Sequence, residues 1–373
     1  MKIQVRVIRT WSEFLELRPE WETIFEELEG QNPFLSWDWI ESWVEIYGHR
    51  YKPVILVVVD SPRVIGIAAF YFDEKARHGL TKTPAIRWVG DQFVSSEFLD
   101  ILAPVYQKYT VWWNVLNWFL ENRELNWNLL VLDDMIQSRF SVQIVEQISK
   151  KLSLGYHRAV KNVLPVLYFP PEWDKWKHSH PHPDFISMMR NRTKRLRKKF
   201  RVEIRKIGSQ DELKSDIEIF FELHQKNWNY KGLPGSFVTP EKREFYRRIT
   251  RRFLDRNWLE MRLMRIDGAP ATVEVGFALN QVYYSLQSGY DPRFRRFSAG
   301  SILFYEFFQE LLGDGIKRVE FLRGDETYKF RWGAHRRYSV TQWVGNRSLY
   351  GIAYPFYKRQ KNRIKHAALA VFS

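Results

Sequence analysis

Apolar runs separated by short polar turns follow one order that occurs twice along the chain. A β-branched run at 54–59, the turn Asp60-Ser61-Pro62-Arg63 and a second apolar run at 64–72 predict a hairpin. The first half then predicts strands at 86–89, 98–102 and 128–132 and a helix at 109–121. The second half predicts the same order, with strands at 261–266, 271–279, 282–287 and 318–322 and a helix at 301–312.

This repeated order predicts an α/β (α+β) protein made of two related mixed-sheet units. The halves share little sequence identity, so what is repeated is the order of strands and helices and not the sequence itself. We expect an N-terminal unit at 1–163, a crossing segment at 164–207, a C-terminal unit at 208–350 and a basic tail at 351–373. Five prolines between 165 and 183 favour an extended start to the crossing segment, with a helix to about 200 and a strand at 202–207 after it. Two more helices are expected at 211–229 and 240–257.

Composition excludes several classes of site. The 373 residues include no cysteine, so disulfides, thiolate nucleophiles and Fe–S clusters are excluded and a reducing compartment, the cytoplasm, is expected. No apolar run approaches the roughly 20 residues that span a bilayer. The sequence motifs of serine hydrolases, P-loop NTPases and zincins are absent. The tract His178, His180 and His182 is interpreted as an exposed linker, so no metal is expected.

The net charge of +15 favours an anionic partner. Ten basic residues and one acid lie in the stretch 190–206, which gives it a local charge of +9. This stretch could line a channel for an anionic substrate or a tRNA backbone, or it could be a solvated surface helix. Its few aromatic residues do not favour nucleic acid. The basic tail allows peripheral contact with an anionic membrane face, although no clear apolar face is evident in it.

The loop before the helix at 301–312 is the most informative segment. It contains two arginines, Arg295 and Arg296, followed by Ser298, Ala299 and Gly300. A helix start offers unpaired N–H groups and a positive dipole end to a phosphate, and glycine lets a ligand approach the backbone. The spacing resembles the pyrophosphate loop of GNAT acyltransferases, with Ser298 where that family has its first glycine. The alternative interpretation is a helix cap with solvated arginines.

A second segment, 321–334 (FLRGDETYKFRWGA), resembles the late signature of the CelD-type (BioF-like) branch of the GNAT superfamily. Softer matches lie at 33–39, 98–103, 223–228 and 287–291, so the resemblance covers about 30–335. It implies a tandem pair of GNAT-like units with a degenerate N-terminal one, as in the related Fem-type aminoacyl transferases. The implied reaction is N-acyl transfer from acetyl-CoA or another acyl-CoA to an amine.

The acceptor is not fixed by the resemblance. We expect an amino sugar or another cell-envelope or polysaccharide precursor, with the enzyme in the cytoplasm or at the inner face of the membrane. Two alternatives stay open: Fem-like transfer from aminoacyl-tRNA, and a non-catalytic scaffold in polysaccharide assembly. The oligomeric state and the acyl group are left open.

Each candidate residue has a role that the resemblance or the chemistry implies. The donor-binding positions are Gln287, Arg295, Arg296, Ser298, Ala299, Gly300 and Ser301. The candidate bases are Asp325, Glu326, Asp100 and His224, with Tyr328 as the acid for the leaving thiolate. Arg323 and Lys329 are expected as charge clamps, and Trp37 and Trp228 as acceptor contacts. The alternatives are turn-fixing ion pairs for Asp325 and Glu326, a turn cap for Asp100, and a packed core position for His224.

Overall fold

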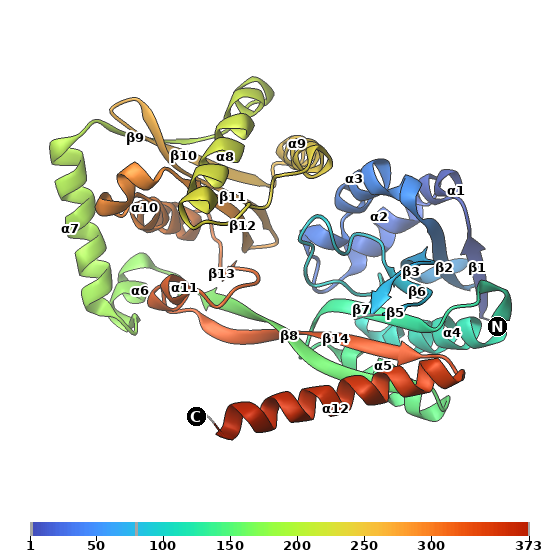
Figure 1. The fold of residues 1–373 in the computed structure, drawn as a ribbon. Helices are drawn as coiled ribbons and strands as arrows, with labels where there is room; N and C mark the ends of the chain where they lie inside the picture. Colours follow the sequence, from blue (N-terminus) through green and yellow to red (C-terminus); the bar gives the residue numbers. More distant parts are fainter. Residues whose placement is uncertain (1–2, 79–80, 372–373) are drawn as a thin grey trace. The chain divides into compact units, whose positions relative to one another are not determined.

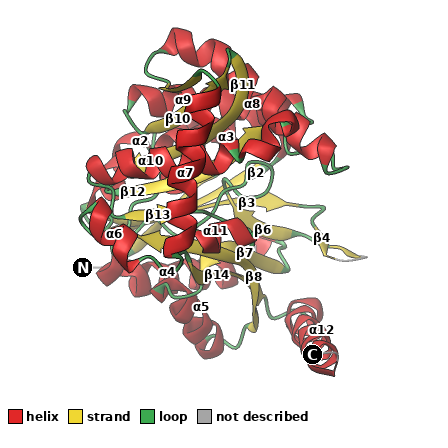
Figure 2. Cartoon of the chain, turned by 90° about the vertical axis from the view of Figure 1, so that its left-hand side faces the viewer, coloured by secondary structure: helices red, strands yellow, loops and turns green. Residues whose placement is uncertain are grey.

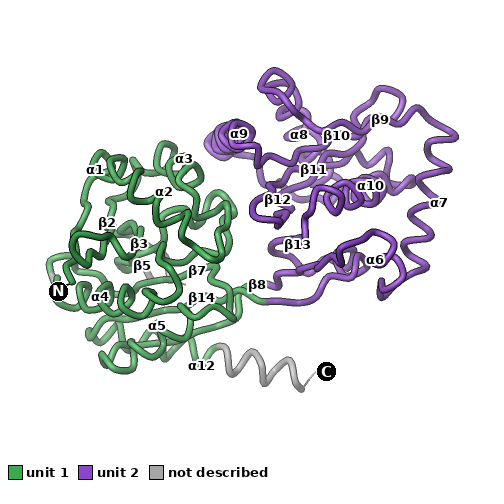
Figure 3. Tube along the Cα trace, turned by 180° about the vertical axis from the view of Figure 1, so that it is seen from behind, with its two compact units in different colours: residues 1–162, 338–373 green, residues 163–337 purple. Residues whose placement is uncertain are grey.

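The computed structural model describes residues 3–78 and 81–371, and the chain in it divides into two compact units (Figures 1 and 3). Unit 1 comprises 1–162 and 338–373, and unit 2 comprises 163–337. The last strand and the tail therefore return to unit 1, whereas the sequence analysis placed them in the second unit and in a separate segment. Mixed sheets covered by helices make up both units, as the apolar pattern predicts.

Unit 1 is built on a mixed sheet in the order β1-β2-β3-β6-β7-β14-β8. Its neighbouring strands are antiparallel in the β1–β2, β2–β3, β3–β6 and β7–β14 pairs, and β6 and β7 are parallel. The strands are β1 (Gln4–Ile8), β2 (Lys52–Asp60), β3 (Arg63–Asp73), β6 (Ala85–Trp88), β7 (Leu129–Ile136), β8 (Gly155–Tyr168) and β14 (His335–Gly345). A small ribbon is formed by β4 (Arg77–His78) and β5 (Thr81–Lys82).

Helices pack on this sheet through large apolar side chains. They are α1 (Trp11–Leu15), α2 (Arg18–Glu27), α3 (Trp37–Tyr47), α4 (Lys108–Glu121), α5 (Phe140–Lys151) and α12 (Leu349–Val371). Much of the core is aromatic: Trp39 and Trp43 are fully buried, and Trp37 stacks on Phe14 with 4.9 Å between ring centroids. Only 2% of Trp37 is exposed. Its expected role as an acceptor contact is therefore wrong, and the residue is part of the core of unit 1.

The strands of unit 2 follow the order β8-β13-β12-β11-β10-β9. Its strands are the end of β8, β9 (Val202–Lys206), β10 (Leu259–Ile266), β11 (Ala269–Leu279), β12 (Val282–Tyr290) and β13 (Arg318–Glu320). Its helices are α6 (Trp173–Ser179), α7 (Pro183–Lys199), α8 (Gln210–Tyr230), α9 (Pro240–Asp255), α10 (Ala299–Gly313) and α11 (Thr327–Arg331). A 3₁₀ helix, η5 (Pro292–Phe297), leads into α10. Helix α7 runs alongside α10 (Figure 2).

Two local predictions differ from the structure. The strand expected at 98–102 is a loop with a single bridge between Ile67 and Leu102, where Asp100 accepts from the N–H of Ile101. The crossing segment contains α6, whose Trp176 is buried against Phe169 and Phe308. The basic tail, for which no secondary structure was predicted, lies mostly in α12. Among the described residues, no helix is long and apolar enough to cross a membrane.

Candidate active site

Strands β12 and β13 of unit 2 separate into a fork. They are parallel and pair only where 282–284 lie opposite 318–320. Beyond that point β12 continues to Tyr290 beside β11, without a β13 partner in the described part of the chain. The β11–β12 register shifts at Gly276, which pairs with Ser285, while Val275 pairs with Gln287; the extra residue is a β-bulge. The bulge and the fork leave one edge of β12 with backbone N–H and C=O groups available to a ligand.

Helix α10 begins beside this fork without a side-chain cap. Its first residue follows Ser298, which has a left-handed backbone (φ 59°, ψ 36°). The first backbone bond of the helix runs from the N–H of Ile302 to the carbonyl of Ser298 (3.0 Å), so the N–H groups of 299–301 precede it. A Cβ added at Gly300 would have only Thr272 Oγ1 within 4 Å, at 3.8 Å. The loop is therefore open to an anion at the position that the sequence predicts.

Arginines from two elements surround this helix start. Arg192 of α7 donates to Ser298 Oγ at 2.6 Å, although the two residues lie far apart in the sequence. Arg295 and Arg296 are both exposed; Arg295 donates to the Tyr230 hydroxyl (3.0 Å). Arg293 is instead paired with Asp291 at 2.8 Å. The basic stretch and the loop, which the sequence analysis treated separately, therefore contribute to one positive site.

Tyr328 lies on α11, in the segment that follows β13. Its ring stacks on Phe304 (6.3 Å between centroids) and meets Phe321 edge-on. Partial burial raises the pKa of Tyr328, and the carboxylates of Glu274 and Glu326 raise it further. The phenol is protonated at neutral pH, as any tyrosine is, and can donate a proton, but its raised pKa makes it a weaker acid than a free tyrosine.

Lys329 does not have the expected role of a charge clamp for substrate. Only 4% of it is exposed, and its Nζ donates to the carbonyls of Arg323 (3.0 Å) and Gly324 (3.4 Å) and pairs with Glu326 (2.9 Å). These contacts fix the turn before α11, where Leu322 and Gly324 have positive φ. Lys329 is therefore a structural residue that positions α11.

Asp325 and Glu326 are exposed and paired, which favours the turn-fixing interpretation over a catalytic base. Asp325 Oδ1 lies 3.3 Å from Nη2 of Arg336. Asp100, in unit 1, is engaged more completely: it accepts from Lys108, from Ser141 Oγ (2.9 Å) and from the N–H of Ile101 (2.8 Å). The expectation that Asp100 is a base is wrong, because a carboxylate saturated by donors, one of them a cation, is a poor proton acceptor.

His224 is held between α8 and β12. It is fully buried, and neither ring nitrogen has a hydrogen-bond partner among the described residues. A Cβ at Gly289 would clash with the backbone of His224, so this glycine allows the close approach of α8. Burial, the largest cause, and the charge of Lys242 together lower the pKa of His224 to about 4, and the side chain of Gln287, which approaches the ring, opposes this shift. The imidazole is therefore neutral at pH 7.

Trp228, expected as an acceptor contact, lies one helical turn beyond His224. The two rings are 5.8 Å apart, and Trp228 is half-buried. Gln287 occupies β12 just after the bulge, on the length of the strand that pairs with β11 alone. Unit 2 therefore brings His224, Trp228 and Gln287 together around β12.

Glu274 is a candidate that the sequence analysis missed. It lies on β11 with 2% exposure, and its Oε1 accepts from Tyr283 (3.0 Å) and Ser285 (2.5 Å). Its Oε2 has no hydrogen-bond partner in the described part of the chain. Burial raises its pKa to about 8. A lone acid between Val273 and Val275 in an apolar strand was the signal that could have identified it.

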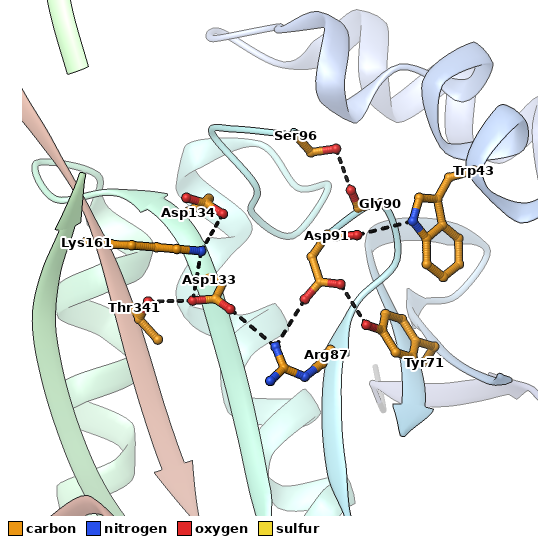
Figure 4. Close-up of polar contacts among 10 residues, drawn as sticks. All are labelled: Trp43, Tyr71, Arg87, Gly90, Asp91, Ser96, Asp133, Asp134, Lys161 and Thr341. Carbon is orange, nitrogen blue, oxygen red and sulfur yellow. Dashed lines mark hydrogen bonds and ion pairs between the residues drawn. The ribbon is translucent and has the colours of Figure 1, made fainter. Parts of the chain in front are cut away.

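Unit 1 has a fork at the corresponding place, but its own side chains fill it. Strand β6 pairs with β7 only where 85–87 lie opposite 129–131. Arg87, the last paired residue of β6, reaches Asp133 of β7 (3.3 Å) and Asp91 of its own segment (3.5 Å) (Figure 4). Tyr71 donates to Asp91 at 2.8 Å, and burial raises the pKa of Asp91 to about 7.

The same network continues to the other side of β7. Lys161 of β8 lies 3.2 Å from Asp133 and 2.7 Å from Asp134, and Thr341 of β14 donates to Asp133 at 2.5 Å (Figure 4). Ion pairs of Arg87 with Asp133 and Asp91 therefore occupy the place where β6 and β7 separate.

Comparisons with known proteins agree with this architecture. Residues 185–330 match the family model described as "Acetyltransferase (GNAT) domain". A crystal structure of FemX is similar with a TM-score of 0.63 at 11% identity, over 96% of this chain and 99% of that one. The structure of L-PGS from Bacillus licheniformis is similar with a TM-score of 0.53 at 12% identity, over 92% of this chain and 96% of that one. A tandem GNAT protein from the clavulanic acid biosynthesis pathway is similar with a TM-score of 0.51 at 12% identity, over 92% of this chain and 100% of that one.

No curated protein matches the chain in sequence. The fold is a tandem pair of GNAT-like mixed α/β units, as the sequence resemblance implies. The family match, which covers most of unit 2, supports an N-acyltransferase enzyme. The CelD-type branch stays a prediction.

Proposed function

We propose that unit 2 transfers an acyl group from acetyl-CoA or another acyl-CoA to an amine. The observation that carries this proposal is the open fork of β12 beside the uncapped start of α10. The N–H groups of 299–301 would bind the donor's diphosphate, with Arg192, Arg295 and Arg296 supplying charge. The filled fork of unit 1 supports one donor site per chain.

The free edge of β12 is suited to the pantetheine arm, which is rich in amides. Backbone N–H groups beyond the bulge would then donate to the thioester oxygen as it becomes an oxyanion. The amine nitrogen attacks the carbonyl carbon, the C–S bond breaks, and the sulfur takes the proton of Tyr328. His224, which is neutral and lies beside Gln287 of β12, is our choice for the group that accepts the proton of the amine, directly or through water.

For the acceptor we keep the sequence-based expectation of an amino sugar or another cell-envelope or polysaccharide precursor, met in the cytoplasm. Fem-like transfer from aminoacyl-tRNA is the second candidate. It is favoured by α7, whose last turn carries Arg197, Lys198 and Lys199. A tRNA complex would weaken steeply with salt, because each phosphate contact releases counterions. The third candidate function is a non-catalytic scaffold in polysaccharide assembly. Such a scaffold would tolerate replacement of Tyr328 and His224 without loss of function.

Calorimetric titration of the full chain with acetyl-CoA tests the donor site. Replacing Arg295 and Arg296 together with Ala should weaken binding by at least tenfold, because charge-assisted hydrogen bonds contribute about 1.5–3 kcal/mol each. Arg293→Ala is the matched control, since Arg293 is already paired with Asp291. Gly300→Val should keep the fold, given the open space there, and lose affinity. Absence of binding by the parent chain would refute the proposal.

A further inference from the structure

Helix α12 is fixed to unit 1 along one face. Near its start, Gly351 packs against the backbone at Gly155 and Gly345, where a Cβ on either glycine would clash with the carbonyl oxygen of Gly351. One turn further on, Tyr354 is buried in an apolar cluster that includes Leu129 and Val131 of β7. These contacts determine which face of α12 points inward.

The opposite face of α12 is apolar and uncovered. Leu349, Ile352 and Phe356 are spaced three and four residues apart, which places them on one side of a helix. Their exposed fractions are 91%, 50% and 60%, and Tyr357 beside them is 55% exposed. From the sequence, no clear apolar face is expected here. That expectation is wrong, because the buried Tyr354 and the exposed Phe356 can be assigned to opposite faces only once the docking of the helix is known.

The charge around this face has a single sign. From 349 to the end of the sequence there are five lysines and arginines and no acidic residue. Lys361 is exposed but, seven residues after the buried Tyr354, lies on the other side of the helix, whereas the exposed Arg359 lies three residues after Phe356 and shares its side. Lys358, in contrast, lies over the ring of Trp343 at 5.1 Å and belongs to the inner face. A large exposed apolar row bordered by cations is typical of helices that lie in the plane of a membrane interface.

We propose that the outer face of α12 binds the surface of an anionic lipid bilayer, with Leu349, Ile352 and Phe356 inserted among the acyl chains. Arg359, on the same side of the helix, would pair with a lipid phosphate at the headgroup level. A second copy of this chain is a poorer occupant, because two such faces would bring like charges together. Nucleic acid would pair with the cations but would leave the apolar row in water. The proposal is independent of the acyl-transfer chemistry, since α12 belongs to unit 1.

Co-sedimentation of the full chain with phosphatidylcholine vesicles, with and without added phosphatidylglycerol, tests this at low and high salt. We expect binding to the anionic vesicles alone, weakened by salt. Arg359→Gln should reduce binding about fivefold, because a cation near the surface contributes about 1 kcal/mol. Lys317→Gln, at an exposed position of unit 2, is the control for the loss of one charge.

Ile352→Ser with Phe356→Ser should abolish the remaining binding without changing the unfolding temperature, because both side chains face solvent. Three results would overturn the proposal: no sedimentation with anionic vesicles at low salt, equal binding to neutral vesicles, or variants that bind like the parent chain. Sedimentation velocity without lipid gives the other test. A dimer that these serine substitutions convert to a monomer would assign the face to self-association instead.

Discussion

Replacing Glu274 with Gln should make the protein more stable, by an amount that grows with pH. Glutamine has nearly the same shape and can still accept from Tyr283 and Ser285, so the packing is retained. The folded protein holds a proton on Glu274 up to a pKa of about 8, whereas the usual value is 4.5. Between these two values the folded state binds more protons than the unfolded state, so the stability of the parent falls as pH rises through that window. The variant has no titratable group at this position, so its stability does not fall in this way as the pH rises.

The magnitude follows from the size of the window. Each pKa unit corresponds to about 1.4 kcal/mol, so the difference in the free energy of unfolding should approach the order of 4 kcal/mol near pH 8. Near pH 5 the difference should almost vanish. Urea denaturation of both chains at several pH values, followed by tryptophan fluorescence and circular dichroism, measures it. Glu222→Gln, at an exposed position of α8, controls for the loss of one charge.

A difference that does not change with pH would refute this reasoning. It would mean that Glu274 is charged in the folded protein and is compensated by groups other than its two hydroxyl donors. A destabilised variant at every pH would point to the same conclusion, because removal of a compensated buried charge leaves its partners unsatisfied.

Three further results are expected. Arg87→Met should destabilise the protein by about 3–5 kcal/mol in thermal unfolding, because Asp133 loses a buried partner, and it should leave acetyl-CoA affinity unchanged; a change in affinity would place a donor in unit 1. Gly345→Ala should destabilise the chain by at least about 1 kcal/mol, because its Cβ would clash with Gly351, and equal stability would show that α12 is not docked there. Tyr328→Phe should lower kcat while KM for the acyl donor stays the same, and an unchanged kcat would exclude this tyrosine as the acid.

The strand and helix pattern of both units could be predicted from the sequence because it depends on local features. The hairpin of β2 and β3 follows from two apolar runs around one polar turn, and helix α10 from the run that follows Gly300. The loop at 98–102 was mistaken for a strand, since its apolar residues are buried there by the surrounding core and not by pairing. The pattern records burial, and burial alone does not distinguish a packed loop from a strand.

The residues of the candidate site also fall into two groups, those that a local motif predicts and those that only the fold brings together. The arginine-rich loop and Tyr328 were recognisable because each lies in one continuous motif. The contact of Arg192 with Ser298 joins residues about a hundred positions apart, and no local pattern encodes such a meeting. Lys329 carries a charge that the sequence offers to a substrate, but the fold directs it to three backbone carbonyls.

By itself the sequence determined that the chain contains two copies of one mixed α/β plan and that a positively charged turn precedes the last long helix of the second copy. Tertiary structure alone decided which copy keeps an open fork. Both forks arise from the same strand order, but Arg87 and Asp133 meet across the first, and no comparable ion pair joins the described residues of β12 and β13. The physical reason is that a buried ion pair depends on the distance between two strands, which is set by the packing of the whole unit and not by any local run of residues.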